Sequence, residues 1–215
     1  SCTHSDITVF SFHPVKIITT AEGGMALTND KDVADKIYRL RTHGITKDEI
    51  KMEERPKDEI WNYQQIDLGF NYRMNDIQAA LGLSQMKRLD KYVKRRQEIA
   101  KHYDNALKKL PLVIPWQSPS NYSSYHLYTI LIKKNLTQKT QRQVYDELIK
   151  KNIGINLHYI PVHRQPYYEN LGFKKNNFPQ AENFHREVLS IPIHPSLKEE
   201  QQSDVIETLK GILTK

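Results

Sequence analysis

The pattern of the first thirty residues predicts two short strands around a turn. Residues 7–12 alternate and carry β-branched and aromatic side chains, as strands do. A polar stretch follows and ends at Gly23-Gly24, a pair suited to a tight turn, and residues 25–28 then read as a short return strand. The pattern therefore predicts two short strands joined by a polar loop.

Helical spacing replaces this alternation after residue 30. Asn29 or Asp30 is suited to cap a helix, and Gly44 is suited to end it. The apolar positions of this helix are Val33, Ile37 and Leu40. Residues 45–68 are charged and show no period, so we expect a long loop there.

A second helical stretch begins after this loop. Asn75 with Gln78 three residues later has the form of a capping box, which marks a helix start. The apolar positions that follow are Ile77, Leu81, Leu89, Tyr92, Val93, Ile99, Tyr103 and Leu107. This pattern is long for one globular helix, so we expect a bend or a break along it.

Prolines and serines gather at 111–124 and mark a change of composition. We therefore expect two domains, one over 1–110 and one over 111–215. The elements expected in the second are a strand at 125–132, a helix capped by Thr137 and ended by Gly154, a strand at 155–159, a helix near 180–188, and a last helix opened by a capping box from Ser196 to Glu199. This order predicts an α/β or α+β arrangement.

Composition narrows the class of protein. The 38% hydrophobic and 27% charged content is typical of a globular protein, and no apolar run reaches the roughly 20 residues that span a bilayer. The single cysteine, Cys2, excludes an internal disulfide and fits a reducing, cytoplasmic setting.

The net charge of +7 raises the question of a nucleic-acid partner. Much of the excess lies at 87–109, where lysines and arginines interrupt the apolar helical pattern. Such a run is usually a solvated helix face, and a mild positive field also suits a small anionic substrate. Nucleic-acid binding through this helix stays open as an alternative, with an affinity that falls steeply with salt.

The densest chemical signal surrounds Lys16. A lysine just beyond a strand, followed by Gly23-Gly24, meets the needs of a Schiff-base site. Its amine must leave bulk water to be neutral, and it must be held against a carbonyl carbon. An isolated lysine is far more often a surface residue, so this position alone does not decide the matter.

The complete string, Ser-Phe-His-x-x-Lys with Thr-x-Glu-Gly-Gly, resembles the lysine-bearing segment of the DegT/DnrJ family of sugar aminotransferases. The resemblance implies an α/β fold, the C-terminal part of a fold-type I pyridoxal-phosphate-dependent transferase: the end of the large-domain sheet plus the smaller C-terminal domain. It implies pyridoxal 5′-phosphate as cofactor, with Lys16 as covalent anchor and proton carrier. Ser11 would lie near the cofactor phosphate and the substrate, although strand serines often bond locally. His13 would contact substrate or satisfy a buried backbone group.

Residues 69–82 resemble a second family string, Gly-x-Asn-x-Arg before a helix with Gln-Ala-Ala. The resemblance implies that Asn71 and Arg73 reach the neighbouring subunit's active site and bind phosphate groups of cofactor and substrate. An amide and a guanidinium near a helix start suit that role. A turn-forming Asn71 and a solvated Arg73 are the alternatives. The family interpretation predicts a homodimer with shared active sites.

Residues 156–163 hold the third group of candidates. On an alternating strand Asn156 and His158 share one face. The resemblance implies that they close over the sugar nucleotide together with Tyr159, with His163 and Tyr167 as weaker candidates. No third ligand has a suitable spacing to the two histidines, so no metal site is expected.

Within the family the chain resembles the 4-aminotransferases of amino-dideoxy sugars, especially the pseudaminic acid branch. The resemblance predicts amino transfer from L-glutamate to a UDP-linked 4-keto-6-deoxy amino sugar. Family members carry the lysine near mid-chain, whereas here it is residue 16. We therefore expect that the acidic partner of the pyridine nitrogen and much of the central sheet are missing, and that this polypeptide alone is inactive. A non-catalytic interaction domain of the same fold stays open.

Overall fold

The computed structural model describes residues 2–56, 58–59 and 62–214 and groups the chain into two compact units, Ser1–Leu89 and Asp90–Lys215. The division lies earlier than the predicted one after residue 110. Helix α3 (Leu89–Leu107) explains the difference, because its buried residues, Tyr103 among them, belong to the core of the second unit. The composition change at 111–124 is thus a loop within the second unit.

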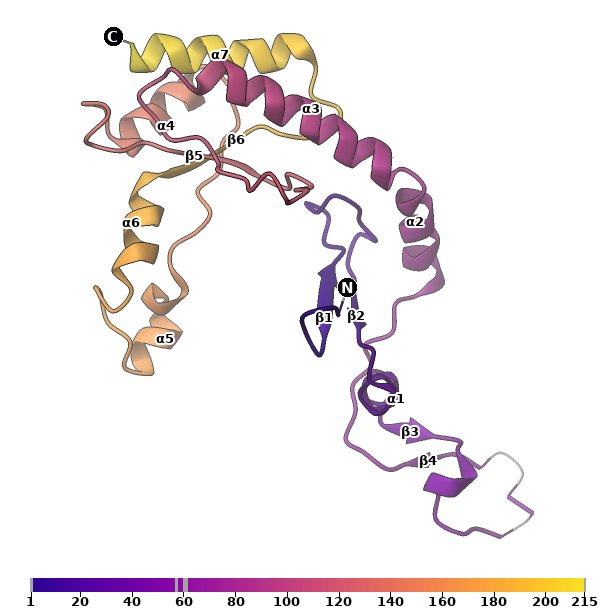
Figure 1. Cartoon of the computed structure of the whole chain (residues 1–215). Helices are drawn as coiled ribbons and strands as arrows, with labels where there is room; N and C mark the ends of the chain where they lie inside the picture. Colours follow the sequence, from indigo (N-terminus) through magenta and orange to yellow (C-terminus); the bar gives the residue numbers. More distant parts are fainter. Residues whose placement is uncertain (1, 57, 60–61, 215) are drawn as a thin grey trace. The chain divides into compact units, whose positions relative to one another are not determined.

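The predicted hairpin opens the first unit. Strands β1 (Thr8–Ser11) and β2 (Gly24–Leu27) pair antiparallel, with Phe10 opposite Met25 and Ser11 opposite Gly24 (Figure 1). The residues between them, 12–23, form a loop that carries Lys16.

Helix α1 (Lys31–Leu40) follows the hairpin. The Asp30 carboxylate accepts hydrogen bonds from the backbone N–H groups of Asp32 at 2.8 Å and Val33 at 3.1 Å, so the predicted cap is confirmed. The helix ends at Leu40, several residues before the expected stop at Gly44. The N–H groups of Thr42 and Gly44 both donate to the Arg39 carbonyl oxygen at 3.0 Å, so Gly44 still helps to close the turn after the helix.

Gly44 lies where two backbone segments cross. It adopts φ +72°, and a Cβ atom placed there would lie 1.9 Å from the carbonyl oxygen of Asp67. The expected long loop at 45–68 is also partly ordered. It contains the short 3-10 helix η1 (Glu49–Lys51) and the antiparallel pair β3 (Ile45–Thr46) and β4 (Gln64–Gln65).

Helix α2 (Asp76–Met86) starts with the predicted capping box. Asn75 Oδ1 accepts from the Gln78 backbone N–H at 2.9 Å, and Gln78 Oε1 accepts from the Asn75 N–H at 3.1 Å. The expected break in the long helical pattern lies at Lys87 and Arg88, between the end of α2 and the start of α3.

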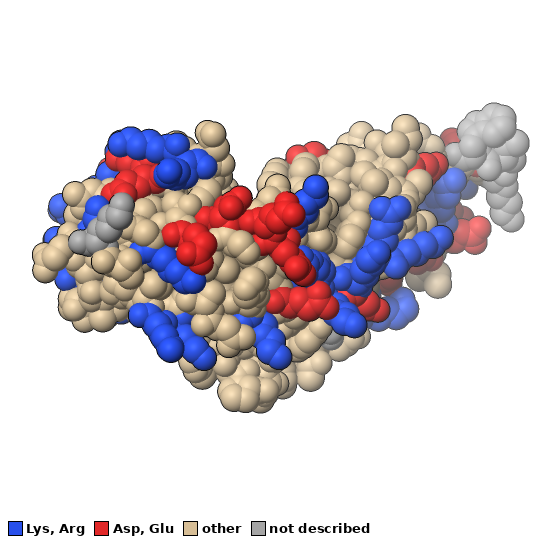
Figure 2. Space-filling model, turned by 90° about the horizontal axis from the view of Figure 1, so that it is seen from above, with Lys and Arg blue, Asp and Glu red and all other residues tan. Residues whose placement is uncertain are grey.

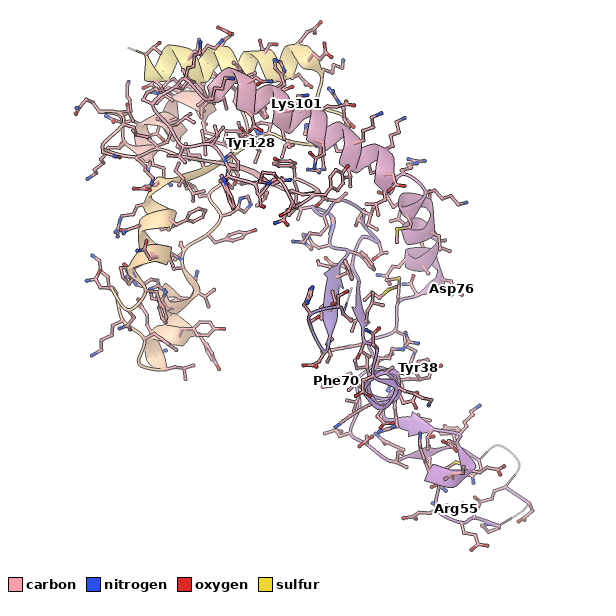
Figure 3. All side chains as sticks on the ribbon, in the orientation of Figure 1. Tyr38, Arg55, Phe70, Asp76, Lys101 and Tyr128 are labelled. Carbon is pink, nitrogen blue, oxygen red and sulfur yellow. The ribbon has the colours of Figure 1, made fainter. Side chains whose placement is uncertain are left out.

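The second unit is built on a two-stranded antiparallel sheet of β5 (Tyr128–Leu131) and β6 (Val188–Ile191). Helices α3, α4 (Gln141–Lys150) and α7 (Glu199–Leu213) surround it, and α3 and α7 run close together (Figure 1). Gln202 joins these two helices by donating from Nε2 to the carbonyl oxygen of Ile99 at 2.8 Å. Tyr128, labelled in Figure 3, lies inside this unit with its ring 4.9 Å from that of Tyr103.

Several predicted boundaries in the second unit are wrong. Thr140 caps α4 in place of Thr137, and the helix ends at Lys150 before reaching Gly154. The last helix begins at Glu199, after a bond from the Lys198 N–H to the Gln201 side chain, so Ser196 does not cap it.

The predicted strand at 155–159 is also wrong, because only Asn156 forms a β-bridge there, with Ser190. The chain continues through η2 (Val162–Arg164), α5 (Pro166–Asn170) and α6 (Pro179–Glu187). No helix in the described residues is long and apolar enough to cross a membrane.

The two units differ in how they bury apolar side chains. The buried hydrophobic residues of the described chain all lie in the second unit. In the described part of the first unit only Thr20 and Gly44 are buried, while side chains such as Val9, Ile77 and Leu83 are more than two-thirds exposed. The fold of the first unit therefore depends on hydrogen bonds and close backbone packing more than on a core.

Candidate functional site

The lysine loop, residues 12–23, is closed at its base by the backbone of Phe12. Its N–H donates to the carbonyl oxygen of Gly23 at 2.9 Å, and its own carbonyl accepts from the Thr20 N–H at 3.0 Å and from Thr19 Oγ1 at 2.9 Å. These bonds give the loop a defined shape without a regular element.

Lys16 lies within this loop and is partly buried. Its backbone N–H donates to the carbonyl oxygen of His13 at 2.9 Å. Among the described residues, its Nζ atom has no hydrogen bond or ion-pair partner. An amine that no carboxylate holds is free to attack a carbonyl carbon, which is the chemistry predicted for it.

Ser11 precedes the lysine loop, His13 lies within it, and both are exposed. Ser11 Oγ accepts from the His13 N–H at 3.4 Å, which is the local bond typical of strand serines, and its hydroxyl hydrogen is left for a ligand. His13 Nδ1 lies 3.4 Å from the backbone nitrogen of Val15, and its Nε2 lies 3.9 Å from a carboxylate oxygen of Glu22. His13 therefore does not satisfy a buried group.

Asn71 and Arg73 lie on an extended segment that the backbone ties to the end of α1. Its Phe70 N–H donates to the Leu40 carbonyl at 2.6 Å, and its Tyr72 N–H donates to the Arg41 carbonyl at 2.9 Å. The rings of Phe70 and Tyr72 stack at 4.9 Å.

Figure 3 labels Phe70 beside α1 and Asp76 at the start of α2, and Asn71 and Arg73 fall between them in the chain. Their side chains are exposed and have no partner within the described part of the chain. An amide and a guanidinium held on an anchored backbone are both available to an anion.

Asn156, His158 and Tyr159 lie in the second unit, and the first two contact Ser190 of β6. The backbones of Asn156 and Ser190 exchange two hydrogen bonds, at 3.1 and 2.9 Å, and His158 Nδ1 lies 2.7 Å from Ser190 Oγ. Tyr159 is 71% exposed and its ring lies edge-on to that of His158. The bridge to β6 thus holds this segment, while Asn156 and Tyr159 offer exposed polar groups.

His163 does not behave as a candidate for substrate contact. It is buried, and its Nε2 lies 3.0 Å from Glu182 Oε1 on α6. The hydrogen bond with His163 lowers the pKa of Glu182, and the Asn176 N–H, 2.6 Å from the same oxygen, acts in the same direction. This pair fastens the segment after Tyr159 to α6. Sequence reasoning missed the pairing because no local motif joins residues so far apart.

Tyr167 is 68% exposed and its ring lies edge-on to that of Tyr168. Its phenol is open to solvent, as a substrate contact requires. No group of three or more metal-binding side chains occurs among the described residues.

The basic run at 87–109 is not a uniform solvated face. Arg96 is buried, and its Nη1 donates to the carbonyl oxygens of Tyr125, His126 and Ile193. Arg95 also bonds inward, to the Leu197 carbonyl at 2.9 Å. Figure 2 shows acidic side chains among the lysines and arginines on the face it presents.

The family model of the DegT/DnrJ/EryC1/StrS aminotransferases matches residues 1–210. The chain belongs to this family. Among curated relatives, it is 38% identical over 211 residues to the spore coat polysaccharide biosynthesis protein SpsC of Bacillus subtilis, covering 97% of this chain and 54% of that protein. It is 35% identical over 212 residues to the UDP-4-amino-4,6-dideoxy-N-acetyl-beta-L-altrosamine transaminase of Campylobacter jejuni, covering 98% and 53%.

Solved structures agree with the fold. The putative sugar aminotransferase Spr1654 of Streptococcus pneumoniae, in its PLP form, superposes with a TM-score of 0.85 at 30% identity, covering 99% of this chain and 53% of that one. Helicobacter pylori PseC, an aminotransferase involved in the biosynthesis of pseudoaminic acid, gives 0.85 at 30% identity, covering 98% and 54%. The chain spans about half the length of the relatives it matches.

These matches confirm the predicted family and the predicted fold class, part of a fold-type I pyridoxal-phosphate-dependent transferase. Pyridoxal phosphate is the cofactor of the family, as predicted. The residues present fit it in two respects. Lys16 offers an amine without a partner in the described chain, and Asn71 and Arg73 offer unpaired donors of the kind that bind phosphate.

Proposed function

We propose that this chain carries the cofactor-anchoring and phosphate-binding residues of a nucleotide-sugar aminotransferase. The enzyme takes its amino group from L-glutamate and gives it to a UDP-linked 4-keto-6-deoxy amino sugar, as in pseudaminic acid biosynthesis. The observation that carries the proposal is the Lys16 amine, which has no partner among the described residues and belongs to a closed loop, within a family match that covers almost the whole chain.

Lys16 has two roles in this proposal. Its Nζ atom would hold the cofactor covalently and, once the amino donor has displaced it, would take the proton from the substrate carbon that bears the nitrogen. Pyridoxal phosphate, when bound, supplies the electron sink for that carbon. The loop's backbone bonds hold the backbone of Lys16 in place, and positioning of a reacting group supplies much of the rate in proton transfer.

The remaining candidates bind and orient the ligands. Arg73 and Asn71 donate to phosphate oxygens of cofactor and substrate, and the Ser11 hydroxyl donates to the same groups. Because Arg73 and Asn71 are exposed and have no partner in the described chain, we assign them to the active site of a neighbouring subunit in a homodimer. Asn156, His158 and Tyr159 hydrogen-bond the sugar.

The choice of UDP-sugar rests on the Campylobacter relative, whose name specifies one. We place the reaction in the cytoplasm, because the single Cys2 suits a reducing compartment. We further propose that residues 1–215 produced alone are inactive. The first unit buries no apolar side chain in its described part, so the lysine loop has no apolar core around it to enclose a cofactor.

The test is covalent capture of the cofactor. Pyridoxal phosphate is added to the protein expressed from its complete reading frame, borohydride reduces the product, and peptide mass identifies the labelled lysine. We expect a visible absorbance band and a label on the Lys16 peptide. The label disappears in Lys16→Ala and persists in Lys36→Ala, a control that removes an exposed lysine of α1.

Substrate identity is tested with a panel of keto-sugar nucleotides, with L-glutamate as donor and mass detection of the amino product. Turnover of a UDP-linked 4-keto-6-deoxy sugar is expected. A protein that takes up no cofactor and turns over no member of the panel is a non-catalytic interaction domain of the same fold, and the proposal is then wrong.

A further inference from the structure

Thr20 is the one described side chain that is buried in the first unit. It lies four residues after Lys16 in the lysine loop and is 2% exposed, whereas the apolar side chains of this unit are partly or fully exposed. Its Oγ1 donates to the carbonyl oxygen of Glu22 at 2.8 Å, and its N–H donates to the Phe12 carbonyl at 3.0 Å. A small side chain is thus enclosed where large ones are not.

Two glycines leave the space that encloses Thr20. A Cβ atom added at Gly82 of α2 would lie 2.7 Å from Thr20 Cγ2. A Cβ atom added at Gly23 would lie 2.3 Å from Thr20 Oγ1 and 2.8 Å from Met74 Cε. Both distances are far below van der Waals contact between such atoms, which begins at about 3.5 Å. The lysine loop therefore packs directly on α2 and on Met74.

This packing joins two parts of the candidate site that are distant in sequence. Met74 follows Arg73 directly, and the Asn75 capping box fixes the start of α2 immediately after it. A displacement of Thr20 from Gly82 would move the Lys16 loop relative to the segment that carries Asn71 and Arg73.

We propose that Thr20 is a positioning residue, which fixes the lysine loop, and with it Lys16, against α2 through the contact of its methyl group with Gly82. The inference rests on the proposed function, because it assigns Lys16 to the cofactor carbonyl. Displacement of a reacting group by 1 Å costs up to about 100-fold in rate, so an added methyl group at this contact has a large effect.

The experiment moves one methyl group across the contact. Gly82→Ala adds a methyl group against Thr20, and Thr20→Ser removes the methyl group that it would meet. The double variant Thr20→Ser/Gly82→Ala contains one methyl group at the contact, as the original protein does. Gly211→Ala on α7 is the matched control, since it is also a helical glycine but has no atom within 4 Å of the added Cβ.

The readouts are the rate at which added pyridoxal phosphate is captured on Lys16 by borohydride, measured by peptide mass, and the hydrogen exchange of amides 12–23. Both use the protein from the complete reading frame. We expect capture in Gly82→Ala to slow by roughly 10- to 100-fold with faster exchange in the loop. The double variant should recover to within about 3-fold of the original, because coupled neighbours are not additive. Gly211→Ala should leave both readouts unchanged.

Two failures are distinguishable. Unchanged capture in Gly82→Ala, or a double variant no better than Gly82→Ala, overturns the role of Thr20 while the original protein is still labelled at Lys16. Absence of label in the original protein overturns the proposed function, and the role of Thr20 with it.

Discussion

Replacement of Arg96 by methionine tests how a buried charge, with no carboxylate partner among the residues that the structure describes, supports the second unit. Arg96 is 5% exposed, and its Nη1 donates to the carbonyl oxygens of Tyr125 at 2.9 Å, His126 at 3.2 Å and Ile193 at 3.0 Å. These carbonyls belong to the segments that precede β5 and follow β6. One guanidinium therefore ties both segments to α3.

Two opposing contributions set the magnitude. Burial of the guanidinium is unfavourable, as its lowered pKa also indicates, and a methionine of similar length relieves that cost. Against this, hydrogen bonds from a charged donor contribute about 1.5–3 kcal/mol each, and a buried carbonyl left without a donor costs about 1–3 kcal/mol. Nη1 carries two hydrogens, so no more than two of the three bonds are strong. We expect Arg96→Met to destabilise the unit by about 2–4 kcal/mol.

The assay is native-state hydrogen exchange, in which the slowest amides of β5 and β6 report the free energy of opening of this unit. Arg95→Met is the control. Arg95 is its neighbour on α3 and is more exposed, and it makes one bond to the Leu197 carbonyl and a 3.4 Å ion pair with Glu98. Its loss should cost no more than about 1 kcal/mol. The reasoning is refuted if Arg96→Met costs no more than Arg95→Met, since relief of the buried charge would then outweigh the lost bonds.

Two further predictions concern a glycine and a carboxylate. Gly44→Ala should destabilise the fold by more than about 3 kcal/mol, because φ is +72° and the new Cβ would lie 1.9 Å from the Asp67 carbonyl oxygen. Gly172→Ala, also at positive φ but in open space, should cost only about 1–2 kcal/mol. Local hydrogen exchange around each site measures both costs, and equal costs would contradict the crowding argument. The hydrogen bond with His163 lowers the pKa of Glu182 in the folded protein. The Glu182 carboxylate therefore contributes fully to stability above its unfolded pKa of about 4.3, and this contribution is lost as pH falls through the lower folded pKa. In thermal melts, the difference in stability between the original protein and Glu182→Gln should therefore become smaller over that acidic pH range. A difference independent of pH would contradict the lowered pKa of Glu182.

Local chemistry made part of this fold readable from the sequence. The Asp30 cap, the Asn75 capping box and the break after α2 all depend on residues within a few positions of one another, and each strand of the hairpin shows its own short pattern. The Lys16 string is local in the same sense, so the family and its cofactor were predictable. Strand β6 was not, because its residues are all buried and follow α6 without a turn signal, so they show neither alternation nor a boundary.

The tertiary structure alone decided which polar residues work in pairs. Arg96 looked like one member of a solvated basic run and is instead bonded to a carbonyl 97 positions away, and His163 looked like a substrate contact and is instead held by Glu182. Thr20 looked like one position of a motif, and only its packing on Gly82 gives it a role. Caps and turns are set by neighbours along the chain, whereas these contacts form only when distant segments fold together and exclude water, which no local pattern of side chains records.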